Sequence, residues 1–552
     1  MSVRNTCFIC SSFESLVLLM LLFLIVPSVS VVGQVEKSKK EVINITSTFK
    51  PSIVKTGKIE FQPEPLKKDT AAYDFVYPTD KVQFPTPMRS FSIRPLSFKQ
   101  DQGGKDSANL FAKLGYGNLS TPFISLGFQR DFTMSNLSVV ADHISSKGNL
   151  PDQEVQHTAV AVRLKHAVSE HQSLSLYTGF DRDAYKLYGF DHLLFNPLSS
   201  ELDQQFNNVH LGAIYQIVAG EKISVSPSIR MDLLSASRDV KEHMFKFNSP
   251  LTYSLNETVR FLIEPKAELV QLNSSLSKKI SNSLIQIPLF GFYSKGYLQV
   301  KGGLVPVLSS GEVKVVPDFS VSYSVGQSGL KVKAGVSNTF NLNSYHLLYG
   351  VNQFVLPPDS LTVSQNTDYF VGVDWLNGKG LQVRLKTGII QYRNQPLFIN
   401  RLGDGKSFSS ILDQSFSALN FEAGTDITIS SQLEVHASLQ AMSFADFTAQ
   451  MKAYGVLPFT MSAGLSWKPF KGFKVRGTAF LWQGAIARTT TVDDFRTKGA
   501  LDLSFGLEYN LNKKWALWVD LNNIANTNYQ RWNQYPSFGF NAIGGVRYSF
   551  HK

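Results

Sequence analysis

The chain beyond residue 109 alternates between apolar and polar residues with a period of two. The final stretch shows the rule most clearly. One face carries Phe538, Phe540, Ala542, Gly544, Val546, Tyr548 and Phe550, and the other carries Asn541, Ile543, Gly545, Arg547 and Ser549. Successive side chains of a strand point to opposite sides, so this pattern predicts a strand with one apolar and one mostly small or polar face. In a membrane barrel the apolar face meets lipid and the other faces the lumen.

The same alternation predicts about 22 strands. With turns placed at clusters of Gly, Asn, Ser and Lys, the expected strands start near Asn109, Thr121, Asn136, Glu154, Gln172, Asn207, Lys222, Met244, Thr258, Ser283, Tyr297, Lys314, Leu330, Thr367, Leu381, Ser417, Leu433, Gly455, Phe473, Gly499, Trp515 and Ser537. Polar faces carry charges such as Arg384 and Lys386. Placing such a charge in lipid costs roughly 2–4 kcal/mol at the bilayer midplane, which fixes the register.

Short and long connections interleave along these strands. Tight turns are expected at Gly220-Glu221, Lys295-Gly296, Gly378 to Gly380, Ser430 to Gln432, Lys471-Gly472 and Lys513-Lys514. Long connections are expected at Ser145 to Gln156, Ala184 to Gln205, Asn273 to Asn282, Tyr349 to Asn366, Tyr392 to Phe416 and Ala485 to Lys498. Outer-membrane barrels have short periplasmic turns and long outer loops, so both ends of the barrel are expected on the periplasmic side.

The last forty or so residues resemble one family closely. The segment from Asp520 to Asn526, then Tyr529, Trp532, Tyr535-Pro536 and Gly544 to Phe550, is similar to the last two strands of TonB-dependent receptors. The resemblance implies an outer-membrane location and uptake of a nutrient. Aromatic usage and the proline-rich segment near the N-terminus also resemble proteins of the Bacteroidetes phylum.

Composition agrees with a barrel wall. Aromatic residues make up 12% of the chain and charged residues 18%. No stretch after residue 33 supplies the roughly 18 apolar residues that a membrane helix needs, so a membrane crossing must use strands. The net charge of +11 comes from scattered residues rather than a basic patch, which argues against nucleic acid and favours a basic lumen or contact with acidic lipid.

The first 33 residues are expected to be a signal peptide. Arg4 precedes an apolar run from Leu16 to Val26, and small residues follow before Gln34. Both cysteines, Cys7 and Cys10, precede the apolar run. The mature chain would then have no disulfide, no thiol nucleophile and no cysteine-bound metal.

Residues 34–108 differ from the barrel, residues 109–552. Seven prolines make a continuous sheet improbable, and a periplasmic or lumen-filling tail is expected. The family has a globular plug domain at this position, and this tail is too short for it, so energised uptake does not carry over from the resemblance. The segment Glu41, Val42, Ile43, Asn44 and Ile45 resembles the box that pairs with TonB as an added strand, or is an ordinary piece of the tail.

No catalytic, cofactor or metal signature is found, and we expect no enzyme activity. His436 beside Glu434 and the pair Asp493-Asp494 are weak metal candidates, better explained as lumen and loop residues. Two aromatic-rich stretches at the outer ends of strands contain the candidate ligand or partner contacts, namely Tyr185, Tyr188, Arg531, Trp532 and Tyr535. These residues either grip a ligand or partner, or form the aromatic belt and folded loops that close the mouth.

The sequence therefore predicts an all-β transmembrane antiparallel barrel of about 22 strands with a proline-rich N-terminal tail. The expected function is porin-like passage or receptor-like uptake of a nutrient across the outer membrane, with TonB or an outer-membrane lipoprotein as partners. The alternative is a structural or accessory barrel subunit of an outer-membrane assembly or export complex. A barrel of this size must also be filled, by the tail, by infolded loops or by a partner.

Overall fold

The computed structural model describes residues 108–551, except 191–195, 276, 379, 402–404, 449–451 and 489–493. The signal peptide and tail predictions, including the segment Glu41 to Ile45, lie outside the described residues. None of the helices in the described part is long and apolar enough to cross a membrane.

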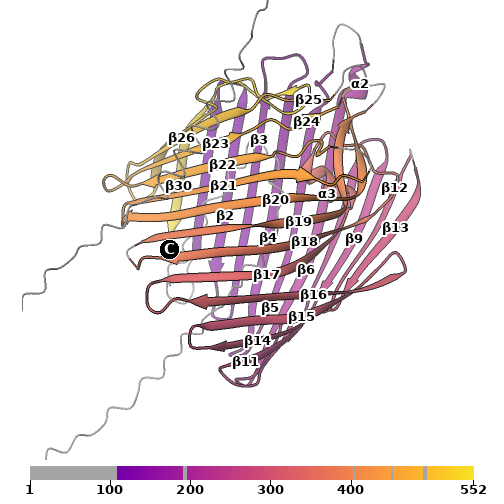
Figure 1. Ribbon diagram of the computed structural model, residues 1–552. Helices are drawn as coiled ribbons and strands as arrows, with labels where there is room; N and C mark the ends of the chain where they lie inside the picture. Colours follow the sequence, from indigo (N-terminus) through magenta and orange to yellow (C-terminus); the bar gives the residue numbers. More distant parts are fainter. Residues whose placement is uncertain are drawn as a thin grey trace, which may run out of the picture. The chain divides into compact units, whose positions relative to one another are not determined.

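The described chain is a closed antiparallel β-barrel (Figure 1). Each strand pairs with the next, and the last strand pairs with the first through nine residue pairs from Asn109–His551 to Gly117–Ile543. The strands of the first half are β1 (Ala108–Gly117), β2 (Thr121–Asp131), β3 (Ser135–Lys147), β4 (Glu154–Ser169), β5 (Gln172–Lys186), β6 (Asp203–Ala219), β7 (Ile223–Val225), β8 (Ser228–Ala236), β9 (Val240–Asn248), β10 (Leu251–Ser254), β11 (Val259–Ile263), β12 (Lys266–Ser274), β13 (Ser277–Gln286), β14 (Leu289–Lys295) and β15 (Leu298–Ser309).

The second half contains the longer strands and most of the loop structure. Its wall strands are β16 (Glu312–Ser324), β17 (Leu330–Leu342), β18 (Val363–Leu376), β19 (Leu381–Asn400), β20 (Phe408–Ser430), β21 (Leu433–Ala445), β22 (Phe459–Trp467), β23 (Phe473–Trp482), β26 (Ala500–Asn510), β27 (Trp515–Asn522) and β30 (Asn541–His551). The loops contain α2 (Ser199–Leu202), α3 (Tyr345–Val351), β24 (Ile486–Ala487), β25 (Phe495–Arg496), β28 (Gln530–Trp532) and β29 (Tyr535–Pro536).

The 26 wall segments make 22 crossings, which confirms the predicted strand number. Four crossings are each divided in two by an Xaa-Pro dipeptide, between β7 and β8, β9 and β10, β11 and β12, and β13 and β14. The four dividing prolines and Pro306 of β15 lie at one level of the wall, and we call this set the proline row: Pro227, Pro250, Pro265, Pro288 and Pro306.

Every junction along the proline row keeps one hydrogen bond where an ordinary ladder has two. The residue facing each proline donates its N–H to the proline carbonyl, in Tyr215 to Pro227, Ser226 to Pro250, Ser249 to Pro265, Glu264 to Pro288 and Ile287 to Pro306, at 2.9–3.1 Å. Proline has no N–H, so the return bond is missing at each of these junctions. The alternation predicted these strands, but not that their prolines would align.

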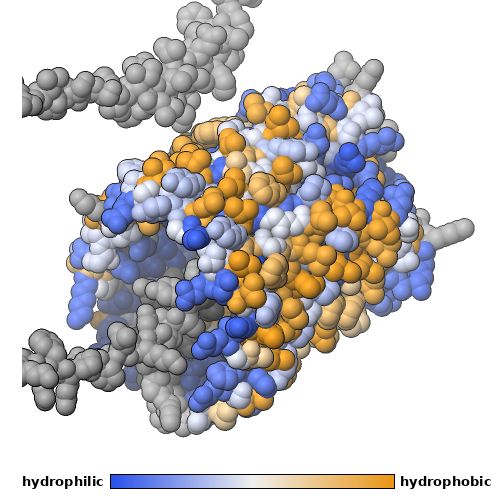
Figure 2. All heavy atoms as spheres, turned by 60° about the horizontal axis from the view of Figure 1, so that its bottom comes forward, coloured by the Kyte–Doolittle hydropathy of each residue, from blue (hydrophilic) through white to orange (hydrophobic). Residues whose placement is uncertain are grey.

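The apolar faces of the strands point outward, as predicted. Val546 and Tyr509 are 39% and 45% exposed, whereas the alternating residues Ile543 and Glu508 are buried. Figure 2 shows apolar side chains in a band on the wall in view, with hydrophilic residues toward its ends. This arrangement is that of a barrel surrounded by lipid.

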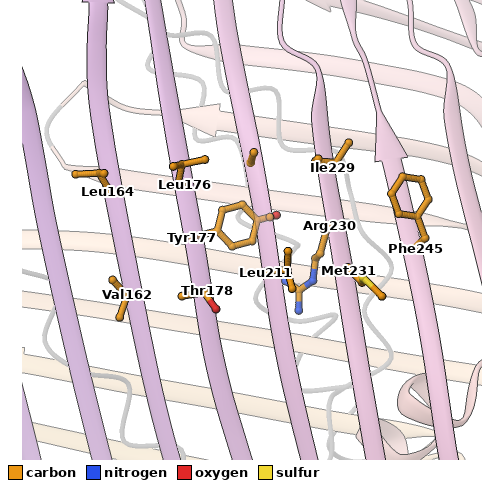
Figure 3. A pocket seen from close by; sticks show the side chains of 12 residues that line it. Val162, Leu164, Leu176, Tyr177, Thr178, Leu211, Ile229, Arg230, Met231 and Phe245 are labelled. Atoms are coloured by element: carbon orange, nitrogen blue, oxygen red, sulfur yellow. The ribbon is translucent and has the colours of Figure 1, made fainter.

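An apolar hollow lies on the outer wall over β4, β5, β6, β8 and β9 (Figure 3). Its volume is about 450 Å³. Outward-facing Leu176, Leu211 and Ile229 stand around the smaller side chains of Thr178 and Ala213. A recess forms because these small residues are diagonal neighbours on adjacent strands.

The connections also follow the predicted parity, although several predicted bounds differ, as at Ser145 to Gln156, where β3 and β4 stay paired up to Lys147 and Glu154. Tight turns connect successive strands on one side of the barrel, which we call the turn end. They lie at 220–222, 296–297, 377–380, 431–432, 468–472 and 511–514. The long connections lie at the opposite, loop end. However, the predicted long connection from Asn273 to Asn282 is wrong, because β12 and β13 pair almost to their ends, with Ser274 opposite Ser277.

Two further differences concern the long strands β19 and β20 and the last strand, β30. The connection predicted from Tyr392 to Phe416 is mostly sheet, since β19 and β20 stay paired up to Asn400 and Phe408. The last strand begins at Asn541, so Phe538 and Phe540 precede it. Local alternation begins before the chain joins the wall, which is why the sequence placed the start of the last strand too early.

Candidate functional site

Three loops fold over one another at the loop end, and we call them the lid: residues 187–202, 343–362 and 523–540. Their described parts share a buried cluster with the adjoining strand ends, and its largest members include Phe206, Tyr349, Phe354, Trp532 and Tyr535. These loops are separated by more than 100 residues in the chain. The lid is therefore a product of barrel closure rather than of any one segment.

Helix α3 is anchored to the wall by a carboxylate. The side chain of Ser344 accepts the N–H of Leu347 at 3.1 Å, which caps the helix. Glu242, a buried lumen-facing residue of β9, accepts the N–H groups of Tyr345 at 2.6 Å and of His346 at 3.1 Å. The first-turn donors, which have no partner within a helix, are thus satisfied by the wall.

Stacked rings join α3 and the other two loops. Tyr349 of α3 lies parallel to Phe206 at 3.6 Å between ring centroids, and Phe354 lies parallel to Tyr535 at 3.5 Å. Tyr188 meets Tyr535 edge-on at 5.0 Å. Such pairs add roughly 0.5–1.5 kcal/mol each beyond the apolar area that they bury.

The tyrosine hydroxyls fasten the loops through backbone carbonyls. Tyr185 donates to the carbonyl of Gln353, and Tyr535 donates to that of Lys406. Tyr188 donates to the carbonyl of Pro536 at 2.9 Å. Burial raises the pKa of Tyr188 to about 12, so this phenol stays a neutral donor at physiological pH.

The lid thus brings together four of the five residues singled out in the sequence. Tyr185, Trp532 and Tyr535 are at most 9% exposed, and their rings are occupied by one another and by neighbouring loops. The sequence analysis missed Glu242 and the aromatic partners on 345–354. The signal was present, because Ser344 followed by apolar residues at 345, 348 and 349 is the pattern of a capped amphipathic turn.

Arg531 is the exception within the lid. Its guanidinium lies over the ring of Trp532, with 4.2 Å between the guanidinium carbon and the ring centroid. Its Nη1 has no hydrogen-bond partner, and no ion pair joins it to an acid in the described part of the chain. Burial lowers the pKa of Arg531 to about 10, which still leaves it cationic at neutral pH.

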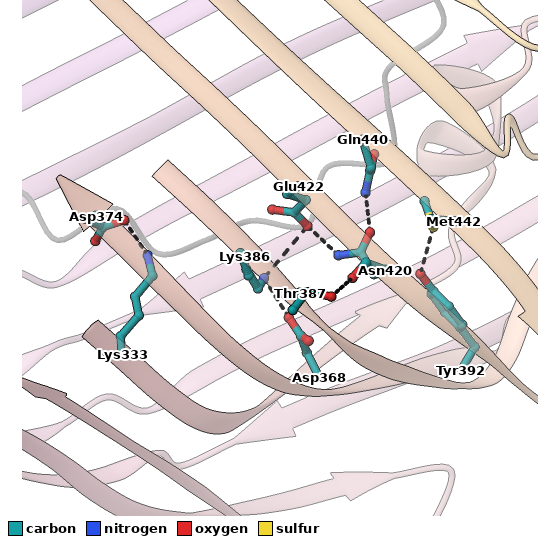
Figure 4. Close-up of polar contacts among 10 residues, drawn as sticks. All are labelled: Lys333, Asp368, Asp374, Lys386, Thr387, Tyr392, Asn420, Glu422, Gln440 and Met442. Carbon is teal, nitrogen blue, oxygen red and sulfur yellow. Dashed lines mark hydrogen bonds and ion pairs between the residues drawn. The ribbon is translucent and has the colours of Figure 1, made fainter. Parts of the chain in front are cut away.

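Charged residues line the lumen in matched pairs. Lys386 lies 2.7 Å from Asp368 and 3.8 Å from Glu422, and Lys333 lies 3.1 Å from Asp374 (Figure 4). Near the closing seam between β1 and β30, Asp520 contacts both Lys113 and Arg476, and Arg547 contacts Glu508, at 3.1–3.4 Å. The inner wall is therefore polar and largely neutralised by its own pairs.

The weak metal candidates are not grouped as ligands. Asp494 is held by two hydrogen bonds from Arg488 and one each from Tyr454 and Lys452, which keep the pKa of its carboxyl well below the usual range. Asp493 lies outside the described residues. Among the residues that the structure describes, no group of three His, Cys, Asp or Glu side chains could hold a metal ion.

Known structures share this fold. No protein family matches the sequence, and no curated protein matches it. The siderophore receptor PirA from Acinetobacter baumannii superimposes with a TM-score of 0.63 at 9% identity, over 81% of this chain and 80% of that chain. The copper transporter OprC gives 0.62 at 13% over 82% and 81%, and the FrpB iron transporter from Neisseria meningitidis gives 0.63 at 10% over 81% and 82%.

The fold and the outward apolar band together establish the class of protein. The chain forms a closed 22-strand barrel of the kind found in outer-membrane receptors, and its place is the outer membrane. By the usual asymmetry of such barrels, the turn end faces the periplasm and the loop end faces outward.

Proposed function

We propose that this protein is an outer-membrane conduit for a nutrient, closed at its outer mouth by the lid. The observation that carries the proposal is an aromatic lid over a lumen lined with charged side chains. A polar inner wall serves a solvated passage, and a lid made of loops outside the wall ladders can open without unfolding the barrel. The similar structures are named as receptors or transporters of siderophores, copper and iron, which supports uptake as the class of function.

The candidate contacts then act in two groups. Tyr185, Tyr188, Trp532 and Tyr535 hold the lid shut, and Arg531 supplies a cation without an acidic partner in the described residues, over the ring of Trp532. A substrate with an anionic group would meet this guanidinium as the lid loosens. Neither a resident cofactor nor a metal is part of the proposal.

The segment 34–108 takes the place of a plug in this proposal. It would gate the periplasmic side of the lumen, and Glu41 to Ile45 would pair with TonB as an added strand. An outer-membrane lipoprotein is the second proposed partner. Deleting residues 41–45 should then abolish uptake that depends on TonB without changing the amount of folded barrel.

Conductance in planar bilayers tests the conduit. Three variants are needed: one with residues 345–360 replaced by a short glycine linker, one without residues 34–107, and one with both changes. We expect the double variant to show stable open steps and the intact protein to show few. A double variant that folds but does not conduct would contradict the conduit.

A disulfide lock tests the lid in the intact chain. Val355 of the lid forms a backbone bridge with Phe408 of β20, so cysteines at these two positions would be close enough to pair. The mature chain is expected to contain no other cysteine. The same variant, oxidised and reduced, is its own control, and we expect passage only after reduction.

The second candidate is a structural subunit of an outer-membrane complex. The extensive ring stacking of the lid and the self-neutralised lumen favour it, since both suit a permanently closed barrel. Purification in mild detergent separates the two functions, because a structural subunit should co-elute with fixed partners in equal amounts, and a lone transporter should not.

A further inference from the structure

The apolar hollow on the outer wall has a cationic margin toward the loop end. Arg182 lies on β5 four residues beyond Thr178, and Lys241 lies on β9 four residues before Phe245. Four residues of a strand span about 13 Å, so both cations stand at one height above the hollow. They share a row of outward-facing partners, in which Arg182 pairs with Asn207, Asn207 with Ser235, and Ser235 with Lys241.

These two cations differ from their neighbours on the same wall. Lys147 is paired with Glu154 at 3.5 Å, and Lys186 with Asp152 at 3.1 Å. Neither Arg182 nor Lys241 has an ion pair with an acid in the described ranges, and the Nε of Arg182 is buried without a hydrogen-bond partner. The margin of the hollow therefore presents two positive charges and the amide and hydroxyl groups of Asn207 and Ser235.

We propose that this surface binds one phosphorylated, multiply acylated glycolipid of the outer leaflet, of the lipid A class. Its acyl chains would fill the hollow between Leu176, Leu211 and Phe245, where the lining is almost entirely apolar. Its phosphates would lie on Arg182 and Lys241, and its sugar hydroxyls on Asn207 and Ser235. Bidentate donation from a guanidinium suits a phosphate particularly well.

The spacing of the cations and the width of the hollow together favour this lipid over a simple phospholipid. Three strand spacings separate Arg182 from Lys241, or about 14 Å between their backbones. A single phosphate could lie between the two long side chains, but the two chains below it would cover less of a hollow that extends over five strands. A disaccharide headgroup phosphorylated at its ends, with several chains below it, can span the row and cover a hollow that extends over five strands. The site holds for either proposed function, since it lies on the outside of the wall.

Lipid retention by the intact, purified protein tests the site. The barrel is stripped of lipid in detergent, mixed with lipid A, and the bound lipid is counted by native mass spectrometry. Two kinds of variant probe the two parts of the site, R182E/K241E for the headgroup and A213F for the hollow. The matched control is R393E, which reverses an exposed cation on β19 of the opposite wall, and heat-modifiable migration on gels checks folding of each variant.

We expect about one lipid A per wild-type barrel and an unchanged count for R393E. Retention should fall tenfold or more in R182E/K241E, since each basic residue near an anionic headgroup contributes appreciably to binding, and should also fall in A213F. Lipid A without phosphates should behave like the charge-reversed variant. Wild-type retention by either site variant, or equal binding of phosphatidylglycerol, would overturn the proposal.

Discussion

The two halves of the barrel wall satisfy their backbone in different ways. From β17 to β19 the ladders are unbroken, and β19 and β20 form 19 residue pairs from Leu381–Ile427 to Asn400–Phe408 with one break at Asn394. From β6 to β15 the proline row removes one hydrogen bond from every junction at the same level. Both halves turn large apolar side chains outward, whereas the proline row is a difference in the backbone.

This comparison separates two requirements of a membrane wall. Lipid demands an apolar surface, which both halves have, and it also demands paired backbone groups, which the half with the proline row lacks at one level of five successive junctions. The half without the proline row contains the two longest strands, β19 and β20, and the half with the proline row contains short hairpins at 237–239 and 310–311. The row therefore marks the part of the wall that we expect to bend most easily.

The largest expected effect tests the apolar outer surface that both halves share. Replacing Leu419 of the continuous half or Leu211 above the proline row by arginine should destabilise each protein by about 2–4 kcal/mol, because both side chains point into lipid. Unfolding in urea with lipid vesicles measures this. Ser438→Arg, on the lumen face of β21, should be nearly neutral; a large loss there would contradict the assigned faces.

A proline placed in the continuous half should cost somewhat less. Val371 of β18 lies between Ala334 and Thr387 in complete ladders. Val371→Pro removes one N–H and leaves a carbonyl without a donor, at a cost of about 1–3 kcal/mol. Val371→Ala controls for the lost side chain. Equal stability of the two variants would contradict the expected cost of a missing backbone hydrogen bond in these ladders.

Removing the proline row should have a smaller effect of the opposite sign. Replacing Pro250, Pro265 and Pro288 together by alanine restores an N–H at three junctions, and each restored hydrogen bond stabilises the folded state by about 0.5–1.5 kcal/mol. Part of this gain is lost, because alanine makes the unfolded chain more flexible than proline does. We expect slower amide hydrogen exchange in β10, β11 and β14. Exchange as fast as in the wild type would show that the missing bonds do not loosen the wall.

The smallest effect concerns a loop contact beside the continuous half. The pKa of Asp494 is held down by Arg488, so its ionised form stabilises the folded state above the unfolded pKa, near 3.9. This contribution is lost as the pH falls through the lower folded value. Asp494→Asn should lower the melting temperature slightly at pH 7, and the difference from wild type should shrink below about pH 4; a constant difference would exclude this ion pair as its source.

The sequence predicted the wall better than the site. Alternation at Leu433 to Ala441 and at Leu501 to Tyr509 is a property of each strand by itself, because lipid on one side and water on the other impose it residue by residue. The aromatic stretches around Tyr188 and Tyr535 were also visible. Their contact was not, and neither was the part played by Glu242, since a buried carboxylate at a strand end has no local pattern.

What the sequence alone determined is the number of crossings, their direction and the face that each turns to lipid, since these follow from short-range periodicity. The tertiary structure alone decided how neighbouring strands are offset. The offsets place five prolines at one level, set Arg182 and Lys241 in one row, and carry Phe354 onto Tyr535, 181 positions apart in the sequence. Register and closure are collective properties of the sheet, fixed only when every strand has found its neighbours.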